Sequence, residues 1–302
     1  MVTASFVARL GCTLKENPAI LEYAENILLE DSLELSDVEQ AYKKIIDVQF
    51  NHLSNINNVN VLDNEQINEC FRNGNSLFRK RKMNLDSVVF TEIQRDVCKT
   101  IKDATPEAPD TLLTLPDDMV FHADNFDKFF EDIALLNKVE LQKYISEKEL
   151  DQRSGLNNEV IAFIIYMSLT PFYSMYMENV REVNDFSLWR QGYCPICSQN
   201  STIARHRTTD QTRILFCWLC HAEWYFPRLE CPFCDNNNFK KLRYFYVDDD
   251  RSRQIHVCEN CKRYLKTVVG ETLEKAQLLN VEDIETRYLD VLAQREGYKR
   301  PV

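Results

Sequence analysis

Four CxxC motifs lie close together near the C-terminal end of the sequence. The first two are Cys194/Cys197 and Cys217/Cys220, and the next two are Cys231/Cys234 and Cys258/Cys261. A tight turn lets both sulfurs of one motif face an ion, and two such turns complete a tetrahedron of thiolates. The longer gaps, between the first and second motifs and between the third and fourth, suit a two-strand hairpin. We therefore predict two four-cysteine metal sites, paired in chain order, with interleaved pairing as the alternative.

Other uses of these cysteines fit the sequence less well. The N-terminal residues lack the long apolar run of a secretory signal, so we expect a cytoplasmic protein whose thiols stay reduced. A redox-active dithiol usually sits in a βαβ unit, and no such unit surrounds the motifs. Four thiolates leave no open position on an ion, which disfavours metal-activated water chemistry. Structural metal binding contributes on the order of 10–16 kcal/mol, so here the cysteines substitute for an apolar core.

The sequence before residue 186 has the periodicity of helices. Apolar residues recur at helical spacing from Val38 to Leu53, from Val89 to Ile101 and from Phe126 to Leu136, as on the buried face of a helix. Single cysteines at positions 12, 70 and 98 fall in this region and are interpreted as small core residues. These patterns predict an all-α region.

Prolines mark two places in this helical region. Residues 103–118 contain three of them and are predicted to form a linker or long loop. Pro171 is expected to end or kink a helix in the uncharged run 160–177. That run is long enough to cross a bilayer, but its serine, threonine, proline and tyrosine residues favour a buried helix. We therefore expect no membrane span.

Short β-branched and aromatic runs dominate the sequence around the cysteine motifs. They are predicted to form strands at 214–218, 223–226, 241–247, 254–258 and 264–269. One amphipathic helix is expected to start near Asn280 and to stop at Gly297. Its predicted apolar stripe consists of Val281, Ile284, Tyr288 and Val291. The predicted fold class is therefore multi-domain, with an α-helical part followed by small β modules.

Five segments of this region carry a more specific resemblance. They are YCPICS at 193–198, RILFCWLCHAEWYFPRLECPFC at 213–234, LRYFYVDDD at 242–250, CENCKRYLKTV at 258–268 and YLDVLAQREGYKRP at 288–301. In this order and spacing, the sequence resembles the formate dehydrogenase accessory protein FdhE family over its last third.

The resemblance implies an all-α helical N-terminal domain at 1–185, then a first rubredoxin-like four-cysteine ribbon at 186–228. A second such ribbon with the C-terminal helix is expected at 229–302. The implied cofactors are two iron ions, each coordinated by four cysteine thiolates. Zinc is the alternative metal because thiolates bind it more strongly than ferrous iron.

The resemblance also implies a function in the maturation of another protein. Such a protein binds the catalytic subunit of respiratory formate dehydrogenase in the cytoplasm and is required for that enzyme to become active. We therefore expect no enzyme activity and no small-molecule substrate. Glu223 and Trp224 belong to the shared motif and are candidates for partner binding, with ordinary ribbon packing as the alternative.

Two other functions are compatible with cysteine ribbons. A rubredoxin-like iron electron carrier is one, and a nucleic-acid-binding zinc-ribbon protein is the other. The net charge of −11 and a ribbon that is nearly neutral once its thiolates hold metal argue against binding to a phosphate backbone. Three histidines among the cysteines, His206, His221 and His256, are expected to be surface or turn residues and not ligands.

The residues that follow the four motifs depart from the family pattern. The family usually has glycine after the first motif, where this chain has Ser198; His221, Asp235 and Lys262 follow the others. Because glycine adopts a positive φ without steric cost, we expect mild backbone strain in these turns.

Overall fold

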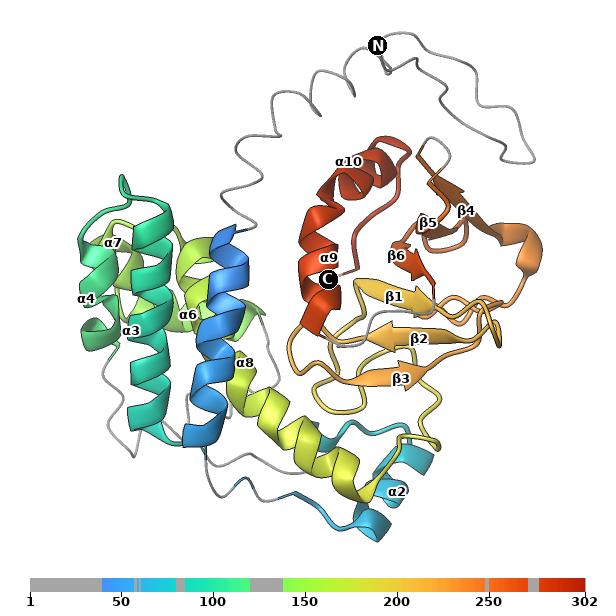
Figure 1. Ribbon diagram of the computed structural model, residues 1–302, viewed down its shortest axis with the longest axis horizontal. Coiled ribbons are helices and arrows are strands. Elements are labelled where there is room, and N and C mark those ends of the chain that lie inside the picture. Colours follow the sequence, from blue (N-terminus) through green and yellow to red (C-terminus); the bar gives the residue numbers. More distant parts are fainter. Residues whose placement is uncertain are drawn as a thin grey trace, which may run out of the picture.

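The computed structural model describes residues 40–56, 59, 61–79, 85–119, 138–247, 250–270 and 277–301. A helical region and a sheet region lie side by side, and the long helix α8 (Asn158–Val183) runs from the first toward the second (Figure 1). This confirms the predicted order of an α-helical part followed by small β modules. The predicted stripe at 126–136 and Cys12 lie outside the described residues.

The helical region precedes residue 184. After the helical residues 40–52 it contains η1 (Leu53–Asn55), α2 (Asn64–Arg72), η2 (Leu77–Arg79), α3 (Ser87–Ala104), α4 (Thr111–Asp118), α6 (Lys138–Glu147), α7 (Leu150–Ser154) and α8. The predicted stripe on α3 is confirmed, since Val89, Ile93 and Val97 are buried. Cys70 and Cys98 are buried in the same core, as predicted.

The expected loop at 103–118 is wrong in its second half, where the structure has α4. This short helix buries Leu112 and Leu115 against the helical core. Pro116 lies near its end, where the proline ring costs one backbone hydrogen bond. Burial of the two leucines outweighs that loss, since each contributes roughly 1.5–3 kcal/mol.

Pro171 does not end α8, so of the two expected outcomes, an end or a kink, the first is excluded. Proline has no N–H group, so the carbonyl of Met167, one turn earlier, loses its helical donor. The buried side chain of Gln49 replaces that donor, with its Nε2 donating to the Met167 oxygen at 2.8 Å. The helix therefore continues through the proline because a distant residue satisfies the free carbonyl.

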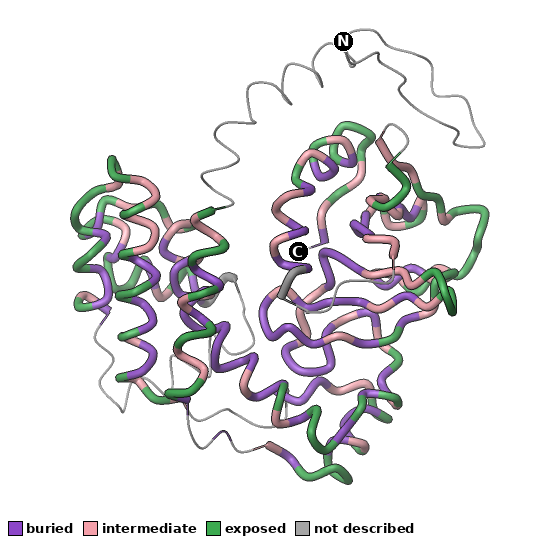
Figure 2. The backbone as a smooth tube through the Cα atoms, viewed as in Figure 1, coloured by how far each residue is buried: buried purple, intermediate pink, exposed green. Residues whose placement is uncertain are grey.

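Helix α8 is a core helix. It is long and apolar enough to cross a membrane, yet 72% of its apolar 18-residue window is buried inside the protein. The tube in Figure 2 shows this burial along the part of α8 that faces the sheet region. The polar residues within this run had predicted a buried helix.

Within the described residues, six strands form one mixed sheet in the order β3-β2-β1-β6-β5-β4. Their bounds are β1 (Ile203–His206), β2 (Arg213–Phe216), β3 (Glu223–Tyr225), β4 (Leu242–Tyr246), β5 (Arg253–Cys258) and β6 (Tyr264–Val269). The five predicted strands are confirmed, and β1 was missed. Strands β1 and β6 pair in parallel, with Ile203 opposite Lys266, and the other neighbours are antiparallel. The sheet thus continues from the first four-cysteine segment into the second.

The C-terminal segment contains two helices where we predicted one. They are α9 (Gln277–Glu285) and α10 (Arg287–Arg295), with a break at Thr286. Asn280 lies inside α9 and does not cap it, and Val291 is exposed. Buried residues of α10 include Leu289, Asp290 and Ala293, so its buried face differs from the predicted stripe and contains an aspartate. Gly297 follows α10 with a positive φ of 85°, as expected for a helix stop.

The largest hydrophobic cluster extends from the helical region into the first four-cysteine segment, whose four cysteines are all part of it. A smaller cluster around Ile255, Tyr264 and Leu289 lies between the far end of the sheet and α10. The predicted divisions of the chain at residues 185 and 228 themselves stay a prediction.

Candidate metal centres

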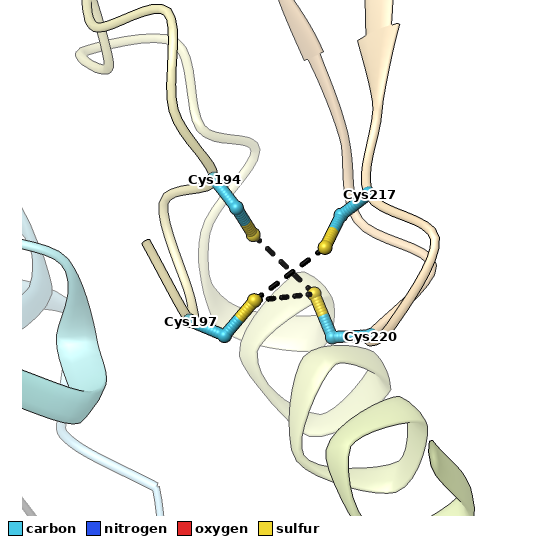
Figure 3. A group of neighbouring side chains, drawn as sticks. All are labelled: Cys194, Cys197, Cys217 and Cys220. Carbon is cyan, nitrogen blue, oxygen red and sulfur yellow. Dashed lines mark hydrogen bonds between the residues drawn. The ribbon is translucent and has the colours of Figure 1, made fainter. Parts of the chain in front are cut away.

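The first group of cysteines converges on one point. Sulfur–sulfur distances are 3.4 Å for Cys194–Cys220, 3.4 Å for Cys197–Cys217 and 3.9 Å for Cys197–Cys220. In Figure 3 the four side chains point inward from two loops toward a common centre. We call this group site 1. All four of its cysteines are buried.

The second group, site 2, consists of Cys231, Cys234, Cys258 and Cys261. Its sulfurs lie 3.7 Å apart for Cys231–Cys261 and 3.8 Å apart for Cys234–Cys258. Asn260 and Asn236 direct side-chain N–H groups at the sulfurs of Cys234 and Cys258, at 3.6 and 3.7 Å. Cys234 and Cys261 are partly exposed, so site 2 lies nearer to solvent than site 1.

Both groups fit a tetrahedral thiolate site. Metal–sulfur bonds of about 2.3 Å imply sulfur–sulfur edges of about 3.8 Å, close to the observed distances. Within each group the sulfurs lie within 4.8 Å of one another, and neither group includes a histidine. The structure therefore assembles the eight cysteines into the two sets that the spacing predicted, and each set could hold one metal ion.

All four motifs share one backbone conformation. The N–H of the residue after each motif donates to the carbonyl of the first cysteine, at 2.8 to 3.1 Å. That residue has a positive φ in every case: 65° at Ser198, 60° at His221, 54° at Asp235 and 56° at Lys262. The left-handed conformation costs a non-glycine residue roughly 1–2 kcal/mol. The expected backbone strain is therefore confirmed in its geometry.

Burial and hydrogen bonds among the four thiols govern thiol ionisation in site 1. Burial raises the pKa of Cys197 and of Cys220 well above the ordinary value. Burial alone would also raise the pKa of Cys217, but hydrogen bonds from the other three thiols hold it well below that value. A divalent ion is what allows four such groups to be thiolates together, because its charge offsets theirs.

Site 1 is anchored directly to the helical region. The backbone N–H groups of Leu77 and Phe78 donate to the carbonyls of Pro195 and Ile196, inside the first motif, at 2.9 and 3.1 Å. The Tyr193 hydroxyl donates to the Gly74 carbonyl at 2.6 Å. The loop that carries two of the sulfurs is therefore held by residues about 120 positions earlier in the chain.

His221 connects site 1 to two helices. We expected a surface or turn residue; it does occupy a turn, but its ring is buried. Asn280 of α9 lies 2.8 Å from Nε2 and also donates to the Trp218 carbonyl, so Nε2 accepts the hydrogen bond. Nδ1 then carries the proton and donates to Ser174 of α8 at 2.9 Å. Burial lowers the pKa of His221 to about 4, consistent with a neutral ring.

The two sites approach each other through Gly192. A Cβ atom at this position would lie 1.9 Å from the carbonyl oxygen of Pro232, which follows the first ligand of site 2. Only glycine lets the backbone before site 1 pass this close to the site 2 loop. Sequence spacing gives no indication of this contact.

Gly192→Ala is expected to lower the free energy of unfolding by about 1–3 kcal/mol or more, because the backbone of one loop must move away from the other. Urea denaturation of the metal-loaded protein measures the change. Ser187→Ala, at an exposed position in the same segment, is the matched control. If the Gly192→Ala protein were as stable as the Ser187→Ala protein, the close approach of the two loops at Gly192 would be contradicted.

Arg213 is a buried cation beside site 2. It lies on β2, in the first four-cysteine segment, and its Nη2 donates to the carbonyls of Pro227 and Glu230, just before Cys231. Burial lowers the pKa of Arg213 to about 10, while the negative charge of Cys231 acts to raise it. Arg213 therefore positions the first loop of site 2 and places a positive charge near its thiolates.

Arg213→Met should weaken metal binding at site 2 by about 10- to 100-fold, the usual effect of removing a residue that supports metal ligands. A colorimetric chelator removes metal from the two sites in two phases, and site 2 gives the faster one. The rate of this faster phase measures how firmly site 2 holds its metal. Arg205→Gln, which removes a cation from neighbouring β1, is the control. Equal release from both variants would rule out a specific contribution of Arg213.

The remaining predicted residues lie within the ribbon. Trp224 is 2% exposed and its Nε1 donates to the Gln191 carbonyl at 3.0 Å, while Glu223 forms an ion pair with Arg205 at 3.2 Å. Their role in partner binding stays a prediction. His206 lies 3.1 Å from Arg228, and His256 lies 3.0 Å from Gln254.

A buried ionic network joins the last strand of the sheet to the C-terminal helices. Lys266, 1% exposed, contacts the carboxylates of Asp283 and Asp290 at 2.6 and 2.7 Å. Arg300 contacts the same two carboxylates at 2.7 and 2.6 Å. The network links β6, α9, α10 and the last residues of the chain, and its two cations balance its two anions. No sequence pattern had indicated this network.

Over part of its length the chain is similar to FdhE proteins. No protein-family model matches the chain. Protein FdhE homolog of Aquifex aeolicus is 23% identical over 171 residues, 56% of this chain and 59% of that protein. Protein FdhE of Escherichia coli O1:K1 is 32% identical over 111 residues, 36% of this chain and 35% of that protein. The matched segments thus span less than two thirds of both relatives.

The fold has a counterpart of known structure. The crystal structure of the FdhE protein from Pseudomonas aeruginosa superposes with a TM-score of 0.54. The superposition covers 94% of this chain and 90% of that protein, at 17% identity. At this identity the likeness concerns the fold, which includes the helical region as well as the sheet.

Proposed function

Because the sequence matches and the shared fold support its place in the FdhE family, we propose that this protein is a maturation factor for formate dehydrogenase. In this proposal it binds the catalytic subunit of the respiratory enzyme in the cytoplasm and is required for that subunit to become active. It acts by binding and catalyses no reaction of its own. The observation that carries the proposal is the similarity to FdhE proteins in a chain that also assembles two complete four-cysteine groups.

The chemistry of the two groups supports a binding protein over a metalloenzyme. Cys194, Cys197, Cys217 and Cys220 would hold one iron or zinc ion, and Cys231, Cys234, Cys258 and Cys261 the other. A metal ion with four thiolate ligands holds its loops together and has no position left for substrate or water. The cysteines thereby fix the loops of both ribbons, and site 1 also fixes the ribbon to the helical region.

Affinity capture tests the proposal. The tagged, metal-loaded protein should recover the immature catalytic subunit of formate dehydrogenase from cells grown under conditions that induce the enzyme. Deletion of the gene for this protein should abolish formate oxidation, and the intact gene should restore it. Normal formate oxidation in the deletion strain, together with no recovery of the subunit, would disprove the proposed function.

One observation favours electron transfer as a second candidate function. Site 2 is partly exposed at Cys234 and Cys261, and exposure is what an electron-carrying iron site needs to reach a redox partner. Iron-loaded protein would then show visible absorption that bleaches with dithionite and returns on oxidation. Colourless protein with zinc in both sites would eliminate this candidate and leave the maturation function intact.

A further inference from the structure

A large cleft separates the helical region from the C-terminal helices. It has a volume of about 510 Å³ and is lined by Tyr42, Phe163, Tyr166, Trp218, Ile284 and Pro301, among others. We call it the central cleft. Its lining includes Tyr166 of α8 and Ile284 of α9. Its volume is within the roughly 300–1,000 Å³ typical of binding sites, which often occur between structural units.

Site 1 forms one wall of the central cleft. Trp218 lies between the ligands Cys217 and Cys220, and its ring packs edge-on against Tyr166 of α8, with 5.8 Å between ring centroids. Gln199 and Asn200, just after the other motif of site 1, also line the cleft. Metal at site 1 therefore fixes the two loops that shape this wall.

The charges of the cleft favour a cationic ligand. Asp283 and Arg300 line it but neutralise each other through their ion pair at 2.7 Å. Glu159, in the first turn of α8, also lines it, is exposed, and pairs with no residue in the part of the chain that the structure describes. The faces of aromatic rings carry partial negative charge and attract cations. A cleft with an apolar, aromatic wall beside a free carboxylate is therefore complementary to a ligand in which apolar side chains adjoin a lysine or arginine.

We propose that the central cleft binds a peptide segment of the partner protein in which apolar residues adjoin a basic residue, and that metal at site 1 is needed for this binding. The apolar side chains pack against Tyr166 and Trp218, and the basic side chain pairs with Glu159. The inference rests on the proposed function, because the partner is the formate dehydrogenase subunit. It adds which surface binds the subunit and which kind of segment is bound.

Two synthetic peptides test the cleft without the subunit. The probe is a fluorescein-labelled twelve-residue peptide of leucine and alanine that ends in two arginines. The control peptide has the same length and label but ends in two glutamates. Anisotropy titration of the full-length, metal-loaded protein should show tighter binding of the arginine peptide. Trp218 emission should change on binding, because Trp189 and Trp224 are buried elsewhere. Equal or tighter binding of the glutamate peptide would overturn the proposal.

Two variants locate the binding site. Glu159→Gln should weaken binding of the arginine peptide by about two- to fivefold, as expected for a partly exposed ion pair. The control Glu182→Gln removes an exposed carboxylate at the other end of α8 and should leave the affinity unchanged. Ala162→Phe, which adds a ring inside the cleft, should weaken both peptides at least tenfold. Unchanged binding by both cleft variants, or a dimer that forms through the cleft in place of peptide binding, would overturn the proposal.

Capture of the intact subunit separates this inference from the function on which it rests. If the wild-type protein captures the subunit and the Ala162→Phe variant does not, the proposed function and the proposed docking surface are both supported. If the two capture it equally, the cleft is not the docking surface, while the proposed function is unaffected. If the wild type captures nothing, the proposed function itself fails, whatever the peptides do.

Discussion

Cys220→Ser is expected to abolish metal binding at site 1 and to unfold the junction between the helical region and the sheet. Site 1 belongs to the same hydrophobic cluster as the helices, and its loop is hydrogen-bonded to Leu77 and Phe78. Tetrathiolate metal binding contributes on the order of 10–16 kcal/mol, as much as the stability of a whole domain. Thermal unfolding followed by circular dichroism should show early loss of helical signal, at least 10 °C below the wild type.

Cys261→Ser is the matched control, since it removes one thiolate from site 2. That site is partly exposed, and none of its four cysteines belongs to the large hydrophobic cluster that contains the cysteines of site 1. We expect loss of one metal ion and local exposure of the β4–β5 end of the sheet to hydrogen exchange, with the helical transition retained. If both serine variants lowered the helical transition equally, site 1 would have no special role in joining the two regions.

Lys266→Met is expected to lower the free energy of unfolding by about 3–5 kcal/mol, the usual result of removing one partner from a buried ion pair. Without Lys266, the carboxylates of Asp283 and Asp290 share Arg300 as their remaining cation in the network. One negative charge then stays buried and uncompensated. Urea denaturation at neutral pH measures the loss.

A second substitution checks that charge balance is the cause. Asp290→Asn added to Lys266→Met removes the unpaired negative charge and should restore a substantial part of the lost stability. Burial acts to raise the pKa of Asp283, but Lys266 and Arg300 hold it below its ordinary 3.8. The ionised Asp283 therefore contributes its full stabilisation above pH 3.8. This stabilisation is lost as the pH falls through the lower pKa that Asp283 has in the folded protein. No recovery in the double variant would contradict the charge-balance explanation.

The metal sites could be predicted because their determinants are local. Two cysteines separated by two residues fix a turn, and a hairpin-length gap fixes which turns meet. The positive φ at Ser198, His221, Asp235 and Lys262 also follows from the turn itself. Five strands were predictable for a similar reason, since each is a contiguous run of β-forming residues.

The errors have a common cause in contacts between distant residues. Strand β1 lacks a strong apolar pattern, and it is held by parallel pairing to β6, some 60 residues later. Pro171 could have ended α8, but Gln49, from another helix, donates to the carbonyl that the proline leaves free. Asp290 is buried because Lys266 and Arg300 meet it from other elements. Periodicity within one segment cannot indicate partners that lie elsewhere in the chain.

The roles of Gly192, Arg213 and Trp218 escaped prediction for the same reason. Each contributes to a metal site or to the central cleft through its position between two segments, and none belongs to a motif with that meaning. In the sequence, Trp218 is one residue within the CWLC motif, and nothing there indicates that its ring packs against Tyr166 of α8. Functional surfaces built at such junctions require the fold before they can be identified.

Elemental analysis of the purified, full-length protein is the decisive test of the two tetrathiolate sites. We expect two iron or zinc ions per chain, with all eight motif cysteines protected from alkylation until the metal is removed. After chelation the sites should lose metal in two phases, site 2 first because it is partly exposed. Metal-free protein that keeps a rigid sheet region while its motif cysteines react freely with the alkylating reagent would show that metal does not hold the two ribbons together.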